Sequence, residues 1–175
     1  MLRRVVAPLV LVAVLAACQS PAEAPRRSAA ATVPPGDLEP SEPFGLTDLT
    51  LVGGDGTAHR LHVYDAHQPA ARRRGLMSRE SLPDDTGMVF RMPSDTDGGF
   101  WMKDTRIPLS VAFFDAEGRI RRILDMEPCT ADPCPVYEPG LTYRGALEVN
   151  QGRFADLGVE RGWRVELSPS LPPPS

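Results

Sequence analysis

Alternating apolar and polar residues mark the start of the folded part of this chain. Residues 48–52 and 60–64 both alternate with the period of two that a strand with one buried face requires. The Gly-Gly-Asp-Gly run at 53–56 supplies residues that adopt positive φ angles in tight turns. The pattern therefore predicts that the two strands form a hairpin.

The segment that follows has the markers of one short helix. Pro69 suits the first turn of a helix, and the arginines at 72–74 suit its negatively polarised C-terminal end. Gly75 suits a left-handed cap. We therefore expect a helix over residues 69–74.

Short apolar runs separated by turn residues continue along the folded part. They predict strands at 88–92, 100–103, 109–115, 119–126, 143–149 and 163–167, with a helical turn at 153–157. Residues 116–118 turn the chain between two of these strands and predict a second hairpin. Many short strands with one or two short helices predict a mainly β domain over residues 46–168, either a small β-barrel or a rolled antiparallel or mixed sheet. The β-helix-β alternation of a parallel doubly wound sheet is not evident.

The first 17 residues have the pattern of a removable signal peptide. Arg3 and Arg4 give a positive start, and residues 5–17 form an apolar run interrupted only by Pro8. As a helix this run would span roughly 20 Å, which is short of the ~30 Å hydrocarbon core of a bilayer. We therefore expect an exported protein from which residues 1–17 are removed.

The boundary after this run, Leu-Ala-Ala-Cys at 15–18, resembles the lipobox of bacterial lipoproteins. The resemblance implies that Cys18 takes the lipid, and that the protein is a cell-envelope lipoprotein bound to the membrane through lipid on Cys18. Acyl chains on this cysteine would hold the protein durably. In a Gram-negative cell, Gln19 favours the outer membrane or the periplasmic face. An ordinary secretory signal with a chance cysteine is the alternative.

Two proline-rich segments flank the domain. Residues 18–45 contain six prolines and few large apolar groups, and residues 169–175 read Pro-Ser-Leu-Pro-Pro-Pro-Ser. Such segments bury too little apolar surface to offset their chain entropy. We expect a lipid-attached disordered linker before the domain and a disordered tail after it.

Length and charge narrow the range of functions. The chain has 175 residues with 19 basic and 23 acidic side chains, for a formal net charge of −4. An acidic balance argues against nucleic-acid binding. The folded part can build one modest core but no separate cofactor domain. No P-loop, dinucleotide-binding or Gly-x-Ser-x-Gly motif is present, and we expect no cofactor.

Five sequence blocks resemble the DUF192 family over about residues 49–167. They are RGLMSR at 74–79, GMVF at 87–90, FWMKDTRIPL at 100–109, MEPC at 126–129 and LEVNQG at 147–152. The resemblance implies one compact β-rich domain, often exported in bacteria, with no established general activity. Members of the family usually carry Asn where this chain has Asp104.

The cysteines that remain after Cys18 form an even pair, Cys129 and Cys134. In an oxidising compartment we expect them to form a disulfide. Closing so small a loop is worth roughly 2 kcal/mol. Neighbouring prolines disfavour the helix that opens at a redox-active pair, and catalytic thiols or metal ligands are the alternative.

No residue pattern predicts a metal site. His59 and His62 lie three apart on a predicted strand and so point to opposite faces, while His67 lies beyond it. Five methionines follow the signal peptide, and thioethers can bind Cu(I). Because these methionines lie in apolar runs, we expect them to fill the core. They are Met77, Met88, Met92, Met102 and Met126.

The FWMKDTR block supplies the best candidate site. On a strand, Phe100 and Met102 would face the core while Trp101 and Lys103 face the other way. We expect ligand contacts from an aromatic platform beside charged groups, namely Trp101, Lys103, Asp104 and Arg106. A packed Trp beside a surface Lys–Asp pair is the structural alternative.

These observations favour a lipid-anchored envelope module that binds a small molecule, a glycan or an envelope-protein partner without catalysis. The alternative is a hydrolase acting on an envelope or extracellular polysaccharide. It would use Asp104 with Glu148 or Asp115 as its two carboxylates. A purely structural envelope module is the third interpretation.

Overall fold

The computed structural model describes residues 44–175. The expected signal peptide, Cys18 and the linker up to residue 43 lie outside the described residues. The strands are β1 (Gly45–Val52), β2 (Ala58–Ala66), β3 (Thr86–Thr96), β4 (Phe100–Trp101), β5 (Leu109–Phe114), β6 (Ile120–Met126), β7 (Val136–Tyr137), β8 (Tyr143–Asn150) and β9 (Arg164–Leu167). The helices are α1 (Pro69–Arg74) and α2 (Arg153–Asp156). Residues 44–175 are therefore mainly β with two short helices, as the sequence predicts for the domain.

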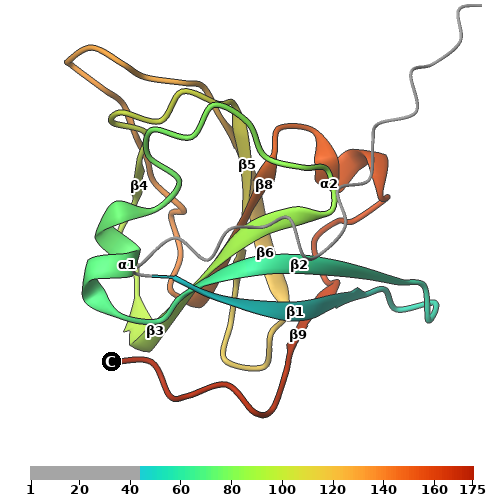
Figure 1. Ribbon diagram of the computed structural model, residues 1–175. Helices are drawn as coiled ribbons and strands as arrows, with labels where there is room; N and C mark the ends of the chain where they lie inside the picture. The colour runs from blue at the N-terminus through green and yellow to red at the C-terminus, as the bar shows by residue number, and fades with distance from the viewer. Residues whose placement is uncertain (1–43) are drawn as a thin grey trace, which may run out of the picture.

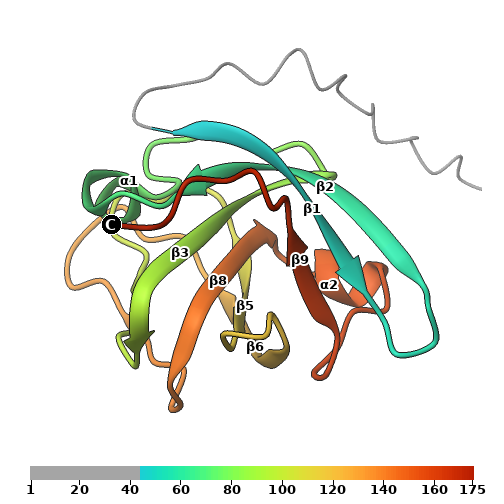
Figure 2. The same cartoon turned by 90° about the horizontal axis from the view of Figure 1, so that it is seen from below.

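Seven strands form one mixed sheet in the order β6-β5-β8-β3-β2-β1-β9. The sheet is strongly curved, so that β9 comes round toward β6 (Figure 2). Three backbone hydrogen bonds join the two ends, among them Ile120 N–H to the Trp163 carbonyl at 2.7 Å. Of the two architectures that the sequence predicts, the structure is the rolled mixed sheet and not a closed barrel. The short β4 and β7 pair separately.

Both predicted hairpins form. Strands β1 and β2 pair antiparallel with Leu49 opposite Leu61, and the glycine-rich turn joins them. Strands β5 and β6 pair antiparallel across residues 115–119. Helix α1 has the predicted limits, and Gly75 follows it at a φ of 49° with its N–H bonded to the Ala71 carbonyl. These elements form where predicted because the signals that specify them are local.

One pair of strands differs from the hairpin arrangement. Strands β2 and β3 run parallel, with Val63 opposite Gly87. Parallel neighbours need a long crossover, and α1 with the loop after it supplies this connection. The crossover places α1 over the outer face of the sheet, on the side of β4 (Figure 1).

The apolar side chains form two cores, one on each face of the rolled sheet. The inner core lies inside the roll and includes Leu51, Val63 and Leu147. The outer core includes Met88 and Phe113 and extends to α1 and the loops on the outer face. The strands β3, β5 and β8 contribute side chains to both cores, as strands buried on both faces must. The candidate site lies within the outer core.

Both flanks of the domain make contacts that we did not predict. Phe44 is buried and packs edge-on against Tyr64, with ring centroids 6.0 Å apart, so order begins before residue 46. At the other end, we expected a disordered tail, whereas the structure places residues 169–175 along the domain (Figure 1). The Ser175 N–H donates to the His67 carbonyl at 3.1 Å, and the Arg91 guanidinium donates to the Pro172 carbonyl at 2.7 Å. Arginine donors from the domain hold this apolar-poor segment in place.

Neither helix within residues 44–175 has the length and apolarity that a membrane crossing needs.

Candidate functional site

A pocket of about 570 Å³ opens on the outer face of the sheet, between α1 and the β4 strand. Its lining comes from α1 and the residues after it, from β3, β4 and the residues between them, from β8, and from Thr105. This volume lies within the range of small-molecule sites. Segments that are far apart in the sequence therefore meet around one cavity.

Aromatic and apolar side chains make up most of the walls. Phe90 and Phe100 meet edge to face, with ring centroids 4.9 Å apart. Tyr143 continues this cluster at 6.5 Å from Phe100, and its hydroxyl donates to the Gly98 carbonyl at 2.7 Å. Met77 and Met92 complete the apolar surface. Burial, reinforced by nearby Asp97 and Glu138, raises the pKa of Tyr143 to about 12, so its hydroxyl is neutral at physiological pH.

Glu148 is the carboxylate that lines this pocket. Its side chain is only 5% exposed, and within residues 44–175 it makes no hydrogen bond or ion pair. Burial raises the pKa of Glu148 to about 8. Carboxyl groups buried in proteins are normally paired or hydrogen-bonded, because leaving them unpaired is unfavourable. An unpaired buried acid in a cavity is therefore a candidate functional group.

The strand alternation of β8 explains why Glu148 faces the pocket. Its neighbours Leu147 and Val149 point into the inner core, so Glu148 points to the opposite, outer face. The residues directly opposite it are Met88 on β3 and Val111 on β5, both fully buried and apolar. Glu148 thus occupies a core position of a central strand, where no local partner can reach its carboxyl.

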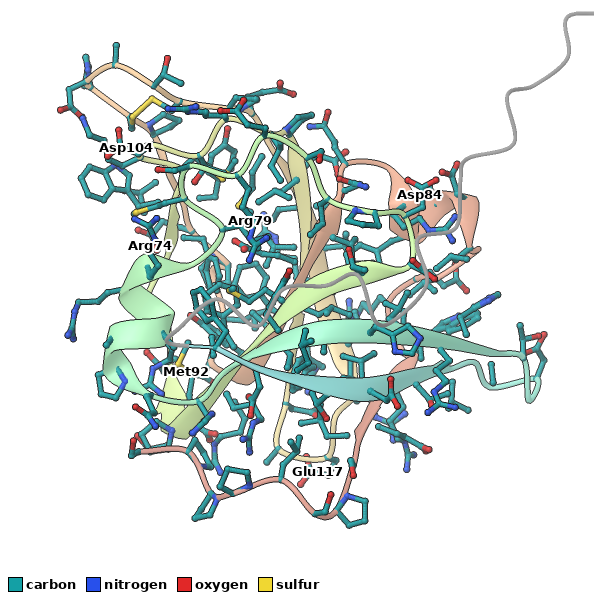
Figure 3. All side chains as sticks on the ribbon, viewed as in Figure 1. Arg74, Arg79, Asp84, Met92, Asp104 and Glu117 are labelled. Carbon is teal, nitrogen blue, oxygen red and sulfur yellow. A yellow bond between two sulfur atoms is a disulfide. The ribbon has the colours of Figure 1, made fainter. Side chains whose placement is uncertain are left out.

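Basic and aromatic residues surround the rim of the pocket. Trp101 is 51% exposed there, beside the three arginines of α1. The Arg72 guanidinium donates to the carbonyls of His67, Arg91 and Ser175, so it fastens α1 to β3 and to the tail. Figure 3 shows Arg74 at the end of α1 that is nearer to Asp104.

The four predicted contact residues do not converge. Of the four, only Trp101 lines the pocket. Lys103 pairs with Asp132, and this hydrogen bond raises the pKa of its ammonium. Arg106 pairs with Glu80 at the surface, and Asp104 is exposed. The predicted alternation holds, because Phe100 and Met102 pack in the outer core while Trp101 faces away. It does not bring Lys103, Asp104 and Arg106 into the cavity.

The predicted cysteine pair supports the rim. Cys129 and Cys134 are at disulfide-bonding distance in the loop between β6 and β7. The Trp101 indole N–H donates to the Cys134 carbonyl at 3.3 Å, and the Cys129 N–H donates to the Thr105 carbonyl at 3.0 Å. The bridged loop therefore contacts two residues that line the pocket.

The histidines have separate neighbours. His59 stacks on Trp163, His62 contacts Asp48, and His67 lies 3.1 Å from Asp65. Within residues 44–175, no group of three His, Cys, Asp or Glu side chains is arranged to hold a metal ion.

The methionines divide into two groups. Three are buried, as predicted for core residues; they are Met88, Met102 and Met126. The other two, Met77 and Met92, are partly exposed and line the pocket. Sequence reasoning assigned all five to the core and did not identify these two as wall residues.

Sequence reasoning named Glu148 only as one of three carboxylates for a hydrolase. In the structure, Glu148 lies in the pocket, whereas Asp115 accepts hydrogen bonds from the Arg119 N–H and the Arg121 guanidinium at the β5–β6 turn. Figure 3 shows Asp104 far from the β5–β6 turn, which is marked there by Glu117. The available sequence signal was one carboxylate within the apolar run 145–149.

Fold and site together define a rolled β domain with a mainly apolar pocket on its outer face that contains the buried Glu148 carboxyl. The model of the DUF192 family, described as uncharacterised, matches residues 50–167, which is more than half of the chain. The chain therefore belongs to the DUF192 family. No protein of curated function matches it.

Two solved structures share the fold. A protein from Sinorhizobium meliloti 1021, described as a proposed transcription regulator, is 30% identical with a TM-score of 0.65; the match covers 71% of this chain and 95% of that one. A protein of unknown function from Novosphingobium aromaticivorans DSM 12444 is 28% identical with a TM-score of 0.66; here the match covers 82% and 99%. The domain thus corresponds to nearly the whole of each relative.

Proposed function

We propose that this DUF192 protein is a lipid-anchored cell-envelope protein whose single domain binds a small molecule without catalysis. The observation that carries the proposal is Glu148, which lies buried in an aromatic-lined cavity of about 570 Å³ and has no partner for its carboxyl among residues 44–175. Pockets of this kind bind through apolar area and use a few polar groups to orient the ligand. Glu148 is the group that would orient it.

The composition of the walls favours a small molecule over the other partners considered. A glycan would need more hydrogen-bonding groups than the mainly apolar lining offers, although a sugar ring could stack on Trp101 at the rim. A protein partner would contact exposed groups such as Trp101 and Val136, which are cross-strand neighbours, and would leave Glu148 unused. A ligand that enters the cavity uses both the walls and the carboxyl.

The absence of a second acid in the lining supports a non-catalytic role. Glycoside hydrolysis uses two carboxylates that flank the scissile bond, about 5 to 9 Å apart. Glu148 is the one carboxylate among the residues that line the pocket, within the part of the chain that the structure describes. Polysaccharide turnover that is lost in Asp104→Asn would contradict the non-catalytic proposal and support the hydrolase.

Lipid on Cys18 would bring the domain to the membrane. Replacement of this thiol in Cys18→Ser removes the lipid acceptor, and we expect the protein to move from the membrane pellet to the soluble fraction. Cys134→Ser is the matched control, because it replaces a cysteine within the domain and should leave the pellet fraction unchanged. Membrane association that survives in Cys18→Ser would contradict the anchor.

Ligand binding is tested by thermal shift on the full chain against metals, sugars, anionic glycans, nucleotides and small apolar molecules. A ligand at 100 times its Kd adds about 2.7 kcal/mol, which is several degrees for a domain of this size. We expect a shift with small apolar molecules that is lost in Trp101→Ala. Leu46→Ala is the control, since it removes an exposed apolar side chain that does not line the pocket. A shift unaffected by Trp101→Ala and by Glu148→Gln would place binding elsewhere.

A further inference from the structure

We propose that the ligand class of the Glu148 pocket is the organic amines, bound as ammonium ions on aromatic or apolar skeletons, with the ammonium paired to the Glu148 carboxylate. This inference rests on the proposed function, because it assumes that the pocket holds a small molecule. It adds the chemical class of that molecule.

Charge complementarity at Glu148 favours an amine as the ligand. Glu148 is only 5% exposed, and no cationic side chain of the described residues pairs with its carboxyl. A carboxylate in this position accepts hydrogen bonds, and the fold provides it with no donor. An ammonium group carries three N–H donors and a positive charge, so it supplies both of the missing partners.

The aromatic wall of the pocket also favours an amine. Phe100 contacts both Phe90 and Tyr143 at the cavity, and Trp101 lies at the rim. Aromatic faces attract cations through their electron-rich π-systems, most strongly where water is excluded. The same rings bind the apolar skeleton of an amine. The walls therefore suit the apolar skeleton of an amine, and the carboxyl suits its ammonium group.

The basic residues around the pocket do not occupy the carboxyl. Arg72 donates to three backbone carbonyls, and Arg73 and Arg74 are exposed to water, which screens their repulsion of a second cation. Arg79, in the loop after α1, stacks 4.1 Å above the Tyr64 ring. Tyr143 is neutral, and burial is the cause that raises the pKa of Glu148. None of these arginines pairs with the Glu148 carboxyl, so the carboxyl is available to a ligand.

Amine binding in this pocket is linked to a proton. Free Glu148 has a pKa of about 8 and is therefore mostly protonated at pH 7. An ammonium ligand pairs with the deprotonated carboxylate, so the carboxyl proton leaves to solvent when the amine binds. Affinity should therefore rise about tenfold for each pH unit as the pH increases toward 8, and should be constant above about pH 8. A neutral ligand releases no proton.

The experiment is calorimetric titration of the full chain with matched probes: 2-phenylethylamine, hexylamine, and the corresponding alcohols 2-phenylethanol and hexanol. Titrations at pH 6, 7 and 8 in two buffers of different ionisation heat count the protons released. We expect the amines to bind at least tenfold more tightly than the alcohols at pH 8, with nearly one proton released at pH 7. Glu148→Gln should remove the preference and the proton, while Glu166→Gln, which neutralises an exposed carboxyl on β9, should preserve both.

The outcomes separate the two proposals. Alcohols that bind as tightly as amines, or amines that bind without proton release, would overturn the ligand class and leave the pocket as a small-molecule site. Amines that fail to bind while another small molecule gives a Trp101-dependent thermal shift would have the same meaning. If neither amines nor any small molecule of the wider panel binds, both proposals fail. The proton count in the wild-type protein keeps the test valid even if Glu148→Gln folds poorly.

Discussion

The Ser78 N–H donates to the Asp104 carbonyl at 2.8 Å, and both residues have left-handed backbone conformations, with φ angles of 64° and 55°. Each is next in sequence to a pocket-lining residue, Met77 and Thr105 respectively. The bond joins the loop after α1 to the loop after β4 across the outer face of the sheet. The left-handed backbone at position 104 favours Asp there, because Asp and Asn tolerate this geometry better than most residues.

The left-handed conformations of Ser78 and Asp104 predict that glycine at either position stabilises the protein. Left-handed geometry is unfavourable by roughly 1–2 kcal/mol for most residues, and glycine adopts it freely. We expect Ser78→Gly and Asp104→Gly each to raise the free energy of unfolding by up to about 1 kcal/mol, and Asp104→Val to lower it. Urea denaturation measures these changes. Lys103→Gly, outside the left-handed region, is the control and should destabilise. If Ser78→Gly and Asp104→Gly both destabilise the protein, the contacts of the Ser78 and Asp104 side chains outweigh the strain of their backbone angles.

Glu148 makes the stability of the protein depend on pH. Its pKa is about 8 in the folded chain and 4.5 ordinarily, so between these values the folded chain binds a proton that the unfolded chain has released. Stability therefore falls as pH rises from about 4.5 to about 8, by ~5 kcal/mol in all, and is then constant. Glu148→Gln should flatten this dependence in urea melts at pH 5, 7 and 9. An unchanged pH profile in Glu148→Gln would mean that other groups cause it.

The buried Asp65–Arg91 pair predicts a large loss of stability when one partner is replaced. The Arg91 guanidinium donates to both carboxylate oxygens of Asp65 at 2.8 and 2.7 Å, and both residues are buried. Asp65→Asn leaves a buried charge without its counter-ion, so we expect a loss of ~3–5 kcal/mol in urea melts. The exposed pair of Arg144 with Asp95 is the control, and Asp95→Asn should change stability by at most about 1 kcal/mol. Equal effects at the two sites would contradict the role of burial.

The cysteine bridge predicts a moderate effect that reaches the rim. It closes a short loop, so the double substitution Cys129→Ser with Cys134→Ser should lower the free energy of unfolding by ~2 kcal/mol. Because the Trp101 indole donates to the Cys134 carbonyl, ligand affinity should fall as well. Denaturation with and without reductant measures the first change. If reductant destabilises the doubly substituted protein as much as the wild type, the bridge is not the cause.

Much of the fold follows from local signals in the sequence. The hairpin between β1 and β2 depends on alternation and on a glycine-rich turn, and α1 depends on Pro69 and Gly75. These signals act over a few residues, so they can be recognised without the rest of the chain. The parallel pairing of β2 with β3 is different, because no single residue encodes which distant strand becomes a neighbour.

The sequence by itself determined the mainly β class, most strand positions, the cysteine pair and the family to which the chain belongs. It also showed that Trp101 faces away from the core, since strand alternation is a local property. Only the tertiary structure decided which charged residues share a cavity. Lys103 and Arg106 find partners at the surface, whereas Glu148 is enclosed by Met88 and Val111 from strands distant in the sequence. Whether a carboxyl is paired or buried alone depends on such long-range neighbours, so its pKa and its availability to a ligand arise with the fold.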